Sequence, residues 1–124
     1  MTINYQVVGI NDVIKSLQNK SKDIIIASKA AIVEGGMLLK EEIENSIAGN
    51  RAEPRSVKTG AFLASISSNE IDKGVEVDSS VDYSAYLEYG TSRIEERRHF
   101  RNSMDRVSPI IVQKVEDNIK AAIA

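Results

Sequence analysis

A helical pattern between about residues 21 and 47 constrains this chain more than any other feature. At 100° per residue, one set of apolar and small residues falls within about 40° of a single line: Ile25, Ile32, Gly36, Leu39, Ile43 and Ile47. Other apolar residues widen that surface: Ile24, Ile26, Ala30, Ala31, Val33, Met37 and Leu38. In a chain of 124 residues, such a helix must be wrapped by its own fold or covered by another chain.

Two adjacent glycines interrupt this helix at Gly35 and Gly36. Each costs about 1 kcal/mol relative to alanine inside a helix, so a close contact should offset the loss. An internal helix crossing and a contact with another subunit explain the pair equally well.

Length and composition indicate one ordinary globular domain over residues 1–124. The chain is 42% apolar and 27% charged and carries a net charge of -2. It has no cysteine, which excludes disulfides and thiolate chemistry. The first ten residues lack the basic start and the apolar run of a signal peptide, and no stretch approaches the ~20 apolar residues of a membrane span. We therefore expect no membrane partner.

The first half of the chain contains further local signals. Residues 3–8 alternate loosely and stop at Gly9, which predicts a strand, and Asn11 or Asp12 can cap a short helix over residues 13–17. Residues 48–58 have no apolar period and predict a long, mobile loop.

The next segment, which begins at Thr59 and Gly60, permits two predictions. Thr59 can cap a helical turn that carries Phe62 and Ile66 at i, i+4 spacing, or a strand can begin directly at Phe62. We favour a short turn that leads into a strand over residues 65–71.

The second half of the chain predicts a sheet and a final helix. Alternation over residues 75–81 indicates a hairpin with one wet face, and residues 83–89 read as a third strand ended by Gly90. Residues 91–98 should be loop, and a helix begins near His99, with a kink or restart at Ser108-Pro109. The expected fold is α+β: a small antiparallel sheet packed against one long central helix and a C-terminal helix.

The residues offer little for catalysis. One histidine and no cysteine exclude a Cys-His pair and a site with several imidazoles. A serine triad around His99 lacks the GxSxG turn, and no phosphate-binding glycine loop is present. We expect no enzymatic activity, no metal and no cofactor.

Charge is unevenly distributed along the chain. The predicted hairpin and third strand carry acidic residues: Glu70, Asp72, Glu76, Asp78, Asp82 and Glu88. An arginine cluster follows: Arg93, Arg97, Arg98, Arg101 and Arg106. These arginines could contact DNA phosphates, grip carboxylates of a neighbouring subunit, or form local surface ion pairs. Oppositely charged patches favour head-to-tail association, which closes into rings.

Three segments together resemble a known family. They are TGAFLASI at residues 59–66, YSAYLEYGTSR at residues 83–93 and RRHFRNSM at residues 97–104. Their order and spacing are similar to small head-tail connector proteins of long-tailed bacteriophages, called neck, tail-completion or minor tail-component proteins. Arg98 and Asn102 stand where that pattern usually has proline, and this departure concerns the loop that enters the last helix.

The resemblance implies a structural α+β subunit that forms a homo-oligomeric ring at the head-tail junction, in the neck or at the end of the tail. Its partners would be portal, head-closure or tail-tube proteins, with non-specific contact to DNA in the channel. It would reside in the virion, and in the host cytoplasm during assembly. The motif positions expected to make subunit contacts are Thr59, Gly60, Phe62, Ile66, Tyr83, Tyr86, Glu88, Tyr89, Gly90, Thr91, Arg93, Arg97 and Arg101. The loop residues expected to face the lumen or a partner are Arg51, Arg55 and Lys58.

Overall fold

The computed structural model describes residues 3–7, 22–71 and 74–123. The elements follow in the order β1 (Ile3–Val7), α2 (Lys22–Ile47), α3 (Ala61–Ala64), β2 (Ile66–Ile71), β3 (Gly74–Ser79), α4 (Ser84–Tyr89) and α5 (His99–Ile123). The short helix predicted at residues 13–17 lies outside the described residues.

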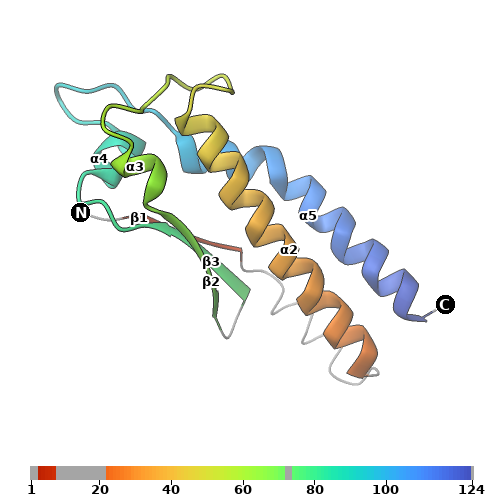
Figure 1. Ribbon diagram of the computed structural model, residues 1–124. Helices are drawn as coiled ribbons and strands as arrows, with labels where there is room; N and C mark the ends of the chain where they lie inside the picture. Colours follow the sequence, from red (N-terminus) through yellow and green to blue (C-terminus); the bar gives the residue numbers. More distant parts are fainter. Residues whose placement is uncertain (1–2, 8–21, 72–73, 124) are drawn as a thin grey trace.

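Two long helices and a small sheet make up the molecule. Helices α2 and α5 lie side by side along most of their length, and the sheet covers α2 on another side (Figure 1). The sheet is antiparallel with strand order β1-β3-β2, in which Ile66 pairs with Ser79 and Ile3 pairs with the same residue from the other side. The predicted α+β class, with its sheet, central helix and C-terminal helix, is confirmed.

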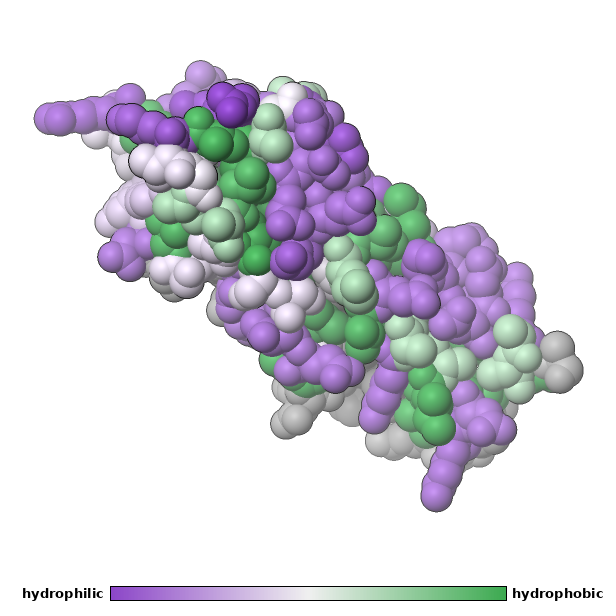
Figure 2. Space-filling model, in the orientation of Figure 1, coloured by the Kyte–Doolittle hydropathy of each residue, from purple (hydrophilic) through white to green (hydrophobic). Residues whose placement is uncertain are grey.

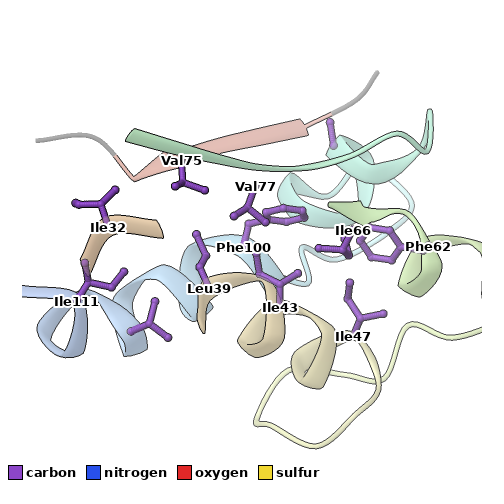
Figure 3. Close-up of a cluster of buried hydrophobic side chains, with 12 residues drawn as sticks. Ile32, Leu39, Ile43, Ile47, Phe62, Ile66, Val75, Val77, Phe100 and Ile111 are labelled. Carbon is purple, nitrogen blue, oxygen red and sulfur yellow. The ribbon is translucent and has the colours of Figure 1, made fainter. Parts of the chain in front are cut away.

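The core forms where α2, the sheet and the start of α5 meet. Leu39 and Ile43 of α2 face Val77 of β3 and Phe100 of α5 (Figure 3). At the end of α2, Ile47 lies beside Phe62 and Ile66. In β3 every second residue is buried, which is the expected consequence of the two-residue period of a strand. The core thus fills the angle between the sheet and the two helices.

The glycine pair of α2 lies against this chain's own side chains. A Cβ atom added at Gly36 would come within 2.3 Å of Val75 Cγ1, and one at Gly35 within 2.9 Å of Ile111 Cγ1. The sheet and α5 both approach α2 closely here. The internal-crossing explanation is therefore correct, and the glycines need no second subunit.

The predicted third strand at residues 83–89 is wrong. This segment is helix α4, in which Ser84, Ala85 and Glu88 are buried and Tyr86 and Tyr89 are exposed. Seven residues fit both a two-residue and a 3.6-residue period, so their alternation alone did not distinguish a strand from a helix. The third strand of the sheet is β1 instead.

Two further predictions concern Pro109 in α5 and the turn that precedes β2. Helix α5 continues through Pro109 without interruption, so the predicted restart is wrong. Proline has no N–H to donate, and because Pro109 is exposed, water can donate to the backbone carbonyl oxygen that this N–H would have served. Gly60, with φ of 84°, occupies the cap position of α3, and Thr59 accepts from the Ala61 N–H at 3.3 Å. The favoured short turn into a strand is confirmed.

Candidate functional site

The most specific part of the motif builds a joint between α4 and α5. The Glu88 carboxylate is fully buried and accepts the backbone N–H groups of Phe100 at 2.8 Å and of Arg101 at 2.9 Å. The first N–H groups of a helix have no partner within the helix itself, and the helix dipole there also favours a negative charge. Glu88 therefore acts as a helix cap supplied from a different helix.

Arg101 completes this joint. Its Nε donates to Glu88 Oε2 at 2.9 Å, and one terminal nitrogen donates to the Glu88 carbonyl oxygen and to Glu96 Oε2. Its guanidinium also lies 4.6 Å from the centre of the Tyr89 ring. Glu88 is therefore buried and paired with an arginine of its own chain, and its predicted place on an acidic surface is wrong.

Gly90 gives the chain its turn between α4 and the following loop. Its φ is 79°, and a Cβ atom here would lie 2.8 Å from both the Glu96 nitrogen and the Ile94 oxygen. Only glycine fits such a close approach in that conformation. Thr91 then orders the loop, because its Oγ1 accepts the N–H groups of Arg93 and Ile94 at 3.1 Å.

The entry into α5 departs from the connector pattern at Arg98. This residue has φ of 59°, a conformation that proline, with φ locked near about -65°, cannot adopt. The Arg98 Nε donates to Asn102 Oδ1 at 3.0 Å. The two positions at which the pattern has proline therefore form a different, hydrogen-bonded entry in this chain.

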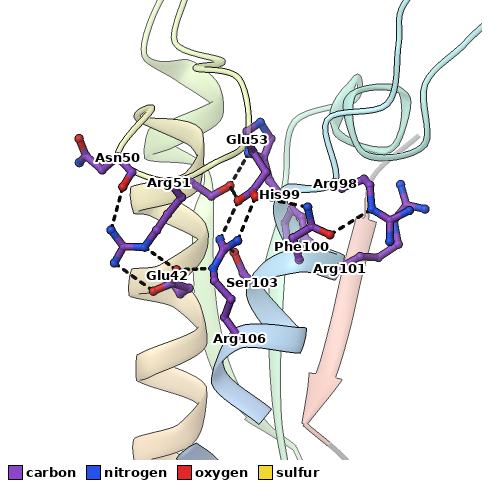
Figure 4. Close-up of polar contacts among 12 residues, drawn as sticks. Glu42, Asn50, Arg51, Glu53, Arg98, His99, Phe100, Arg101, Ser103 and Arg106 are labelled. Atoms are coloured by element: carbon purple, nitrogen blue, oxygen red, sulfur yellow. Dashed lines mark hydrogen bonds and ion pairs between the residues drawn. The ribbon is translucent and has the colours of Figure 1, made fainter. Parts of the chain in front are cut away.

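A second polar cluster fastens the loop at residues 48–58 to the two long helices. Glu53 is buried and accepts two hydrogen bonds from Arg106 of α5, at 2.6 and 2.9 Å. Arg106 also donates to Glu42 of α2 at 2.8 Å, and Arg51 donates to Glu42 at 2.6 Å (Figure 4). Chiefly because of the Arg106 hydrogen bonds, the pKa of Glu53 is lowered to about 2. The loop is thus anchored at its centre, and its predicted mobility stays a prediction.

His99 links this cluster to the rest of the loop. It is fully buried, with Nδ1 at 2.7 Å from Ser46 Oγ and Nε2 at 2.7 Å from Ser56 Oγ. Ser46 donates its proton to Glu53 at 2.5 Å, so His99 Nδ1 must donate to Ser46, and Nε2 of the neutral ring accepts from Ser56. The one Ser56 proton also has the Pro54 carbonyl oxygen within reach at 3.2 Å, but the contact to His99 is the shorter. The direction of hydrogen bonding is that of a serine triad with one hydroxyl inserted.

This cluster is nevertheless poorly suited to nucleophilic catalysis. Burial lowers the pKa of His99 to about 4, far below the near-neutral value that a general base needs. Arg106 already neutralises Glu53, which would otherwise stabilise a protonated imidazole. The cluster holds the loop in place rather than activating Ser56.

A pocket of about 910 Å³ opens beside this cluster. Its walls come from the end of the loop, α3, α4 and the segment that follows α4. Apolar and aromatic side chains form its floor, and three cationic side chains also line it. The apolar and aromatic residues are Phe62, Tyr83, Tyr86, Leu87 and Ile94, and the cations are Arg55, Lys58 and Arg97.

The structure places most of the predicted contact residues and loop residues in two groups. Phe62 and Ile66 are core residues, and Glu88 and Arg101 form the joint. Exposed members that gather around the pocket are Tyr83, Tyr86, Thr91, Thr59, Arg55, Lys58 and, half-buried, Arg97. Arg51 pairs with Glu42 and remains exposed, so its predicted role toward the lumen or a partner stays a prediction. The predicted arginine cluster is divided, because Arg101 and Arg106 form ion pairs within the chain.

Sequence reasoning missed Ser46, Glu53 and Ser56 entirely. Glu53 lies in a polar loop that gave no sign of burial, and the serines have no distinguishing spacing. The one available signal was His99, a lone histidine at the start of a helix, which needed partners for both ring nitrogens.

Comparison with protein-family models, with curated proteins and with solved structures finds no match to this chain. Among the described residues, no group of histidine and carboxylate side chains could hold a metal ion. None of the helices described above has a segment both long and apolar enough to cross a bilayer.

Proposed function

We propose that this chain is a structural subunit of the head-tail junction of a tailed bacteriophage or prophage. In this proposal, copies form a ring around the DNA channel, at the neck or at the end of the tail, and contact portal, head-closure or tail-tube proteins. The subunit performs no reaction. It resides in the virion and, during assembly, in the host cytoplasm.

An apolar line on α2 that remains exposed carries this proposal. Ile26 and Met37 are each 63% exposed, although both belong to a 26-residue helix whose opposite side is buried. Eleven residues advance a helix by just over three full turns, so the two side chains lie on one face, with the exposed Ala30 between them. Figure 2 shows hydrophobic patches between hydrophilic side chains on the surface of the helix pair. A second subunit would cover such a line, as in many oligomers.

The residues of the motif support an architectural role. Its one carboxylate, that of Glu88, and the guanidinium of Arg101 join α4 to α5 and are not free for chemistry. Tyr83, Tyr86 and Tyr89 remain between 43% and 54% exposed, and tyrosine is enriched at protein interfaces. The motif therefore presents contact surface on a rigid joint.

A light-scattering experiment tests the proposal. The purified chain is mixed with a portal and tail-tube connector complex, and electron microscopy then looks for rings on it. We expect Met37→Glu to weaken assembly at least tenfold, because it places a charge on the exposed line. Lys29→Gln changes the charge by the same amount at another exposed position of α2 and should assemble normally. Indifference of the unmodified chain to the complex contradicts the proposal.

A second candidate is direct contact with DNA, favoured by exposed Arg93 and by Arg97, which form no ion pair with a described residue. A gel shift at graded salt separates the two functions, since a binder of several phosphates weakens steeply with salt. Arg101 and Arg106 are already paired internally, so any affinity for free DNA should be weak.

A further inference from the structure

The pocket beside α4 is lined by both apolar and positively charged side chains. Phe62, Leu87 and Ile94 give it an apolar floor, while Tyr83 and Tyr86 add aromatic rings that are 43% and 48% exposed. At about 910 Å³ it reaches the upper range of volumes typical of ligand sites. A bulky apolar group entering it would remove both its own surface and these rings from water.

The cations that line this pocket are among those without an ion pair to a described residue. Arg51, Arg98, Arg101 and Arg106 each have a carboxylate within ion-pair distance. Arg55, Lys58 and Arg97 line the pocket and pair with no carboxylate of the described residues. Three like charges around an apolar hollow attract an anionic ligand and are stabilised by its carboxylates.

We propose that this pocket binds an acidic peptide segment of a partner protein, with one aromatic or large aliphatic side chain on the floor and flanking carboxylates on Arg55, Lys58 and Arg97. A peptide is favoured over a nucleic-acid strand because exposed Glu95, two residues before Arg97, pairs with no cation of the described residues. That carboxylate would repel a long polyanion that passes it, whereas a short acidic segment need not extend that far. The placement of that partner in the virion rests on the proposed function; the binding site itself does not.

Two capped tripeptides test the site on the isolated chain by backbone amide NMR. Acetyl-Glu-Phe-Glu-amide should shift the amides of residues 55–62 and 83–97 saturably, with a dissociation constant of about 1 mM, in keeping with a small ligand. Acetyl-Lys-Phe-Lys-amide has the same aromatic anchor with the opposite charge and should bind at least tenfold more weakly. Equal binding of the two peptides overturns the proposal, as does the absence of shifts at these residues.

Variants assign the interaction to the pocket. The double variant Lys58→Gln with Arg97→Gln should weaken the acidic peptide at least tenfold, and Tyr86→Ser should weaken it by removing part of the floor. Lys29→Gln with Lys120→Gln removes the same charge from exposed helix positions and should bind as the unmodified chain does. The amide spectrum of each variant shows whether it is folded.

Two other occupants would each overturn the proposal. Displacement of the acidic peptide by a single-stranded oligonucleotide at low concentration would assign the pocket to DNA. Shifts of the same amides with rising protein concentration, in the absence of peptide, would assign it to a second copy of this chain. Because no connector complex takes part, failure here leaves the light-scattering test of the proposed function unaffected, and the converse also holds.

Discussion

The two ends of this molecule are held together by different forces. At the end that contains α3, α4 and both long loops, buried ions join the elements: Glu88 with Arg101, and Glu53 with Arg106. Along the helix pair and the sheet, the apolar side chains of Ile111 and Val75 pack closely against Gly35 and Gly36, respectively. The stability of the first end depends on hydrogen-bond partners and charge states, whereas the stability of the second depends on the volumes of the packed side chains.

This difference follows from the kind of backbone at each end. Loops and helix starts leave backbone N–H groups unpaired, so their burial requires acceptors such as the Glu88 carboxylate. Long helices satisfy their own backbone internally and need only a fitting surface. A charge-neutralising substitution should therefore damage the loop end, and a change of size should damage the helix pair.

The largest effect is expected for Glu88→Gln. The amide places an NH2 group among donors and removes the charge that caps α5 and binds Arg101. We expect a loss of about 3 to 5 kcal/mol in the free energy of unfolding, typical of breaking a buried charge pair. Urea denaturation measures it. Glu96→Gln removes the exposed partner of the same arginine and should leave the urea midpoint nearly unchanged; similar losses for both variants would refute the importance of burial.

The second prediction concerns acid. Burial lowers the pKa of His99 in the folded chain from 6.5 to about 4. Between pH 6.5 and pH 4, His99 is therefore protonated in the unfolded chain but neutral in the folded chain. Stability should be complete above pH 6.5 and fall by about 2 to 3 kcal/mol as the pH drops to 4. Urea denaturation across this range measures the change.

His99→Gln is the control for this slope and should flatten it between pH 4 and 6.5. Glu53, with its pKa lowered to about 2, contributes a separate loss at lower pH, between about 4.5 and 2, which Glu53→Gln should remove. Gly36→Ala alters the helix pair and should keep the parent slope. A slope that survives in His99→Gln contradicts the assignment.

The third prediction measures packing along the helix pair. Gly36→Ala gains helix propensity of about 1 kcal/mol but forces a Cβ atom against Val75, at a typical overpacking cost of about 1 to 3 kcal/mol. We expect a net loss of about 1 kcal/mol. Because the clash is with Val75, the loss should shrink in a Val75→Ala background, and a double-mutant cycle by urea denaturation tests this coupling. Strict additivity would show that the contact does not limit the approach.

The smallest effect is expected for Arg51→Gln. Arg51 pairs with Glu42 on the exposed surface, where solvent and salt screen the interaction. Its urea midpoint should nearly match that of the unmodified chain at high salt. Arg106→Gln should be clearly less stable, because Arg106 also serves buried Glu53. Equal behaviour of the two variants would remove the distinction between surface and buried pairs.

Sequence reasoning recovered much of the fold but less of the candidate site. The periods of α2 and α5 are long enough to be unambiguous, and the hairpin alternates clearly. Helix α4 was read as a strand because seven residues fit either period. Glu53 and Ser46 escaped notice, since their partners lie on other elements and their burial depends on where those elements meet.

The amino-acid order by itself determined the long apolar helix, the hairpin, the glycine at position 90 and the absence of cysteine chemistry, because each is a property of neighbouring residues or of composition. Only the tertiary structure decided which charges are used within the chain and which remain around the pocket. Pairing is a matter of distance in space: Arg106 reaches a loop residue 53 positions earlier, while Arg97, nine positions before it, has no such partner among the described residues.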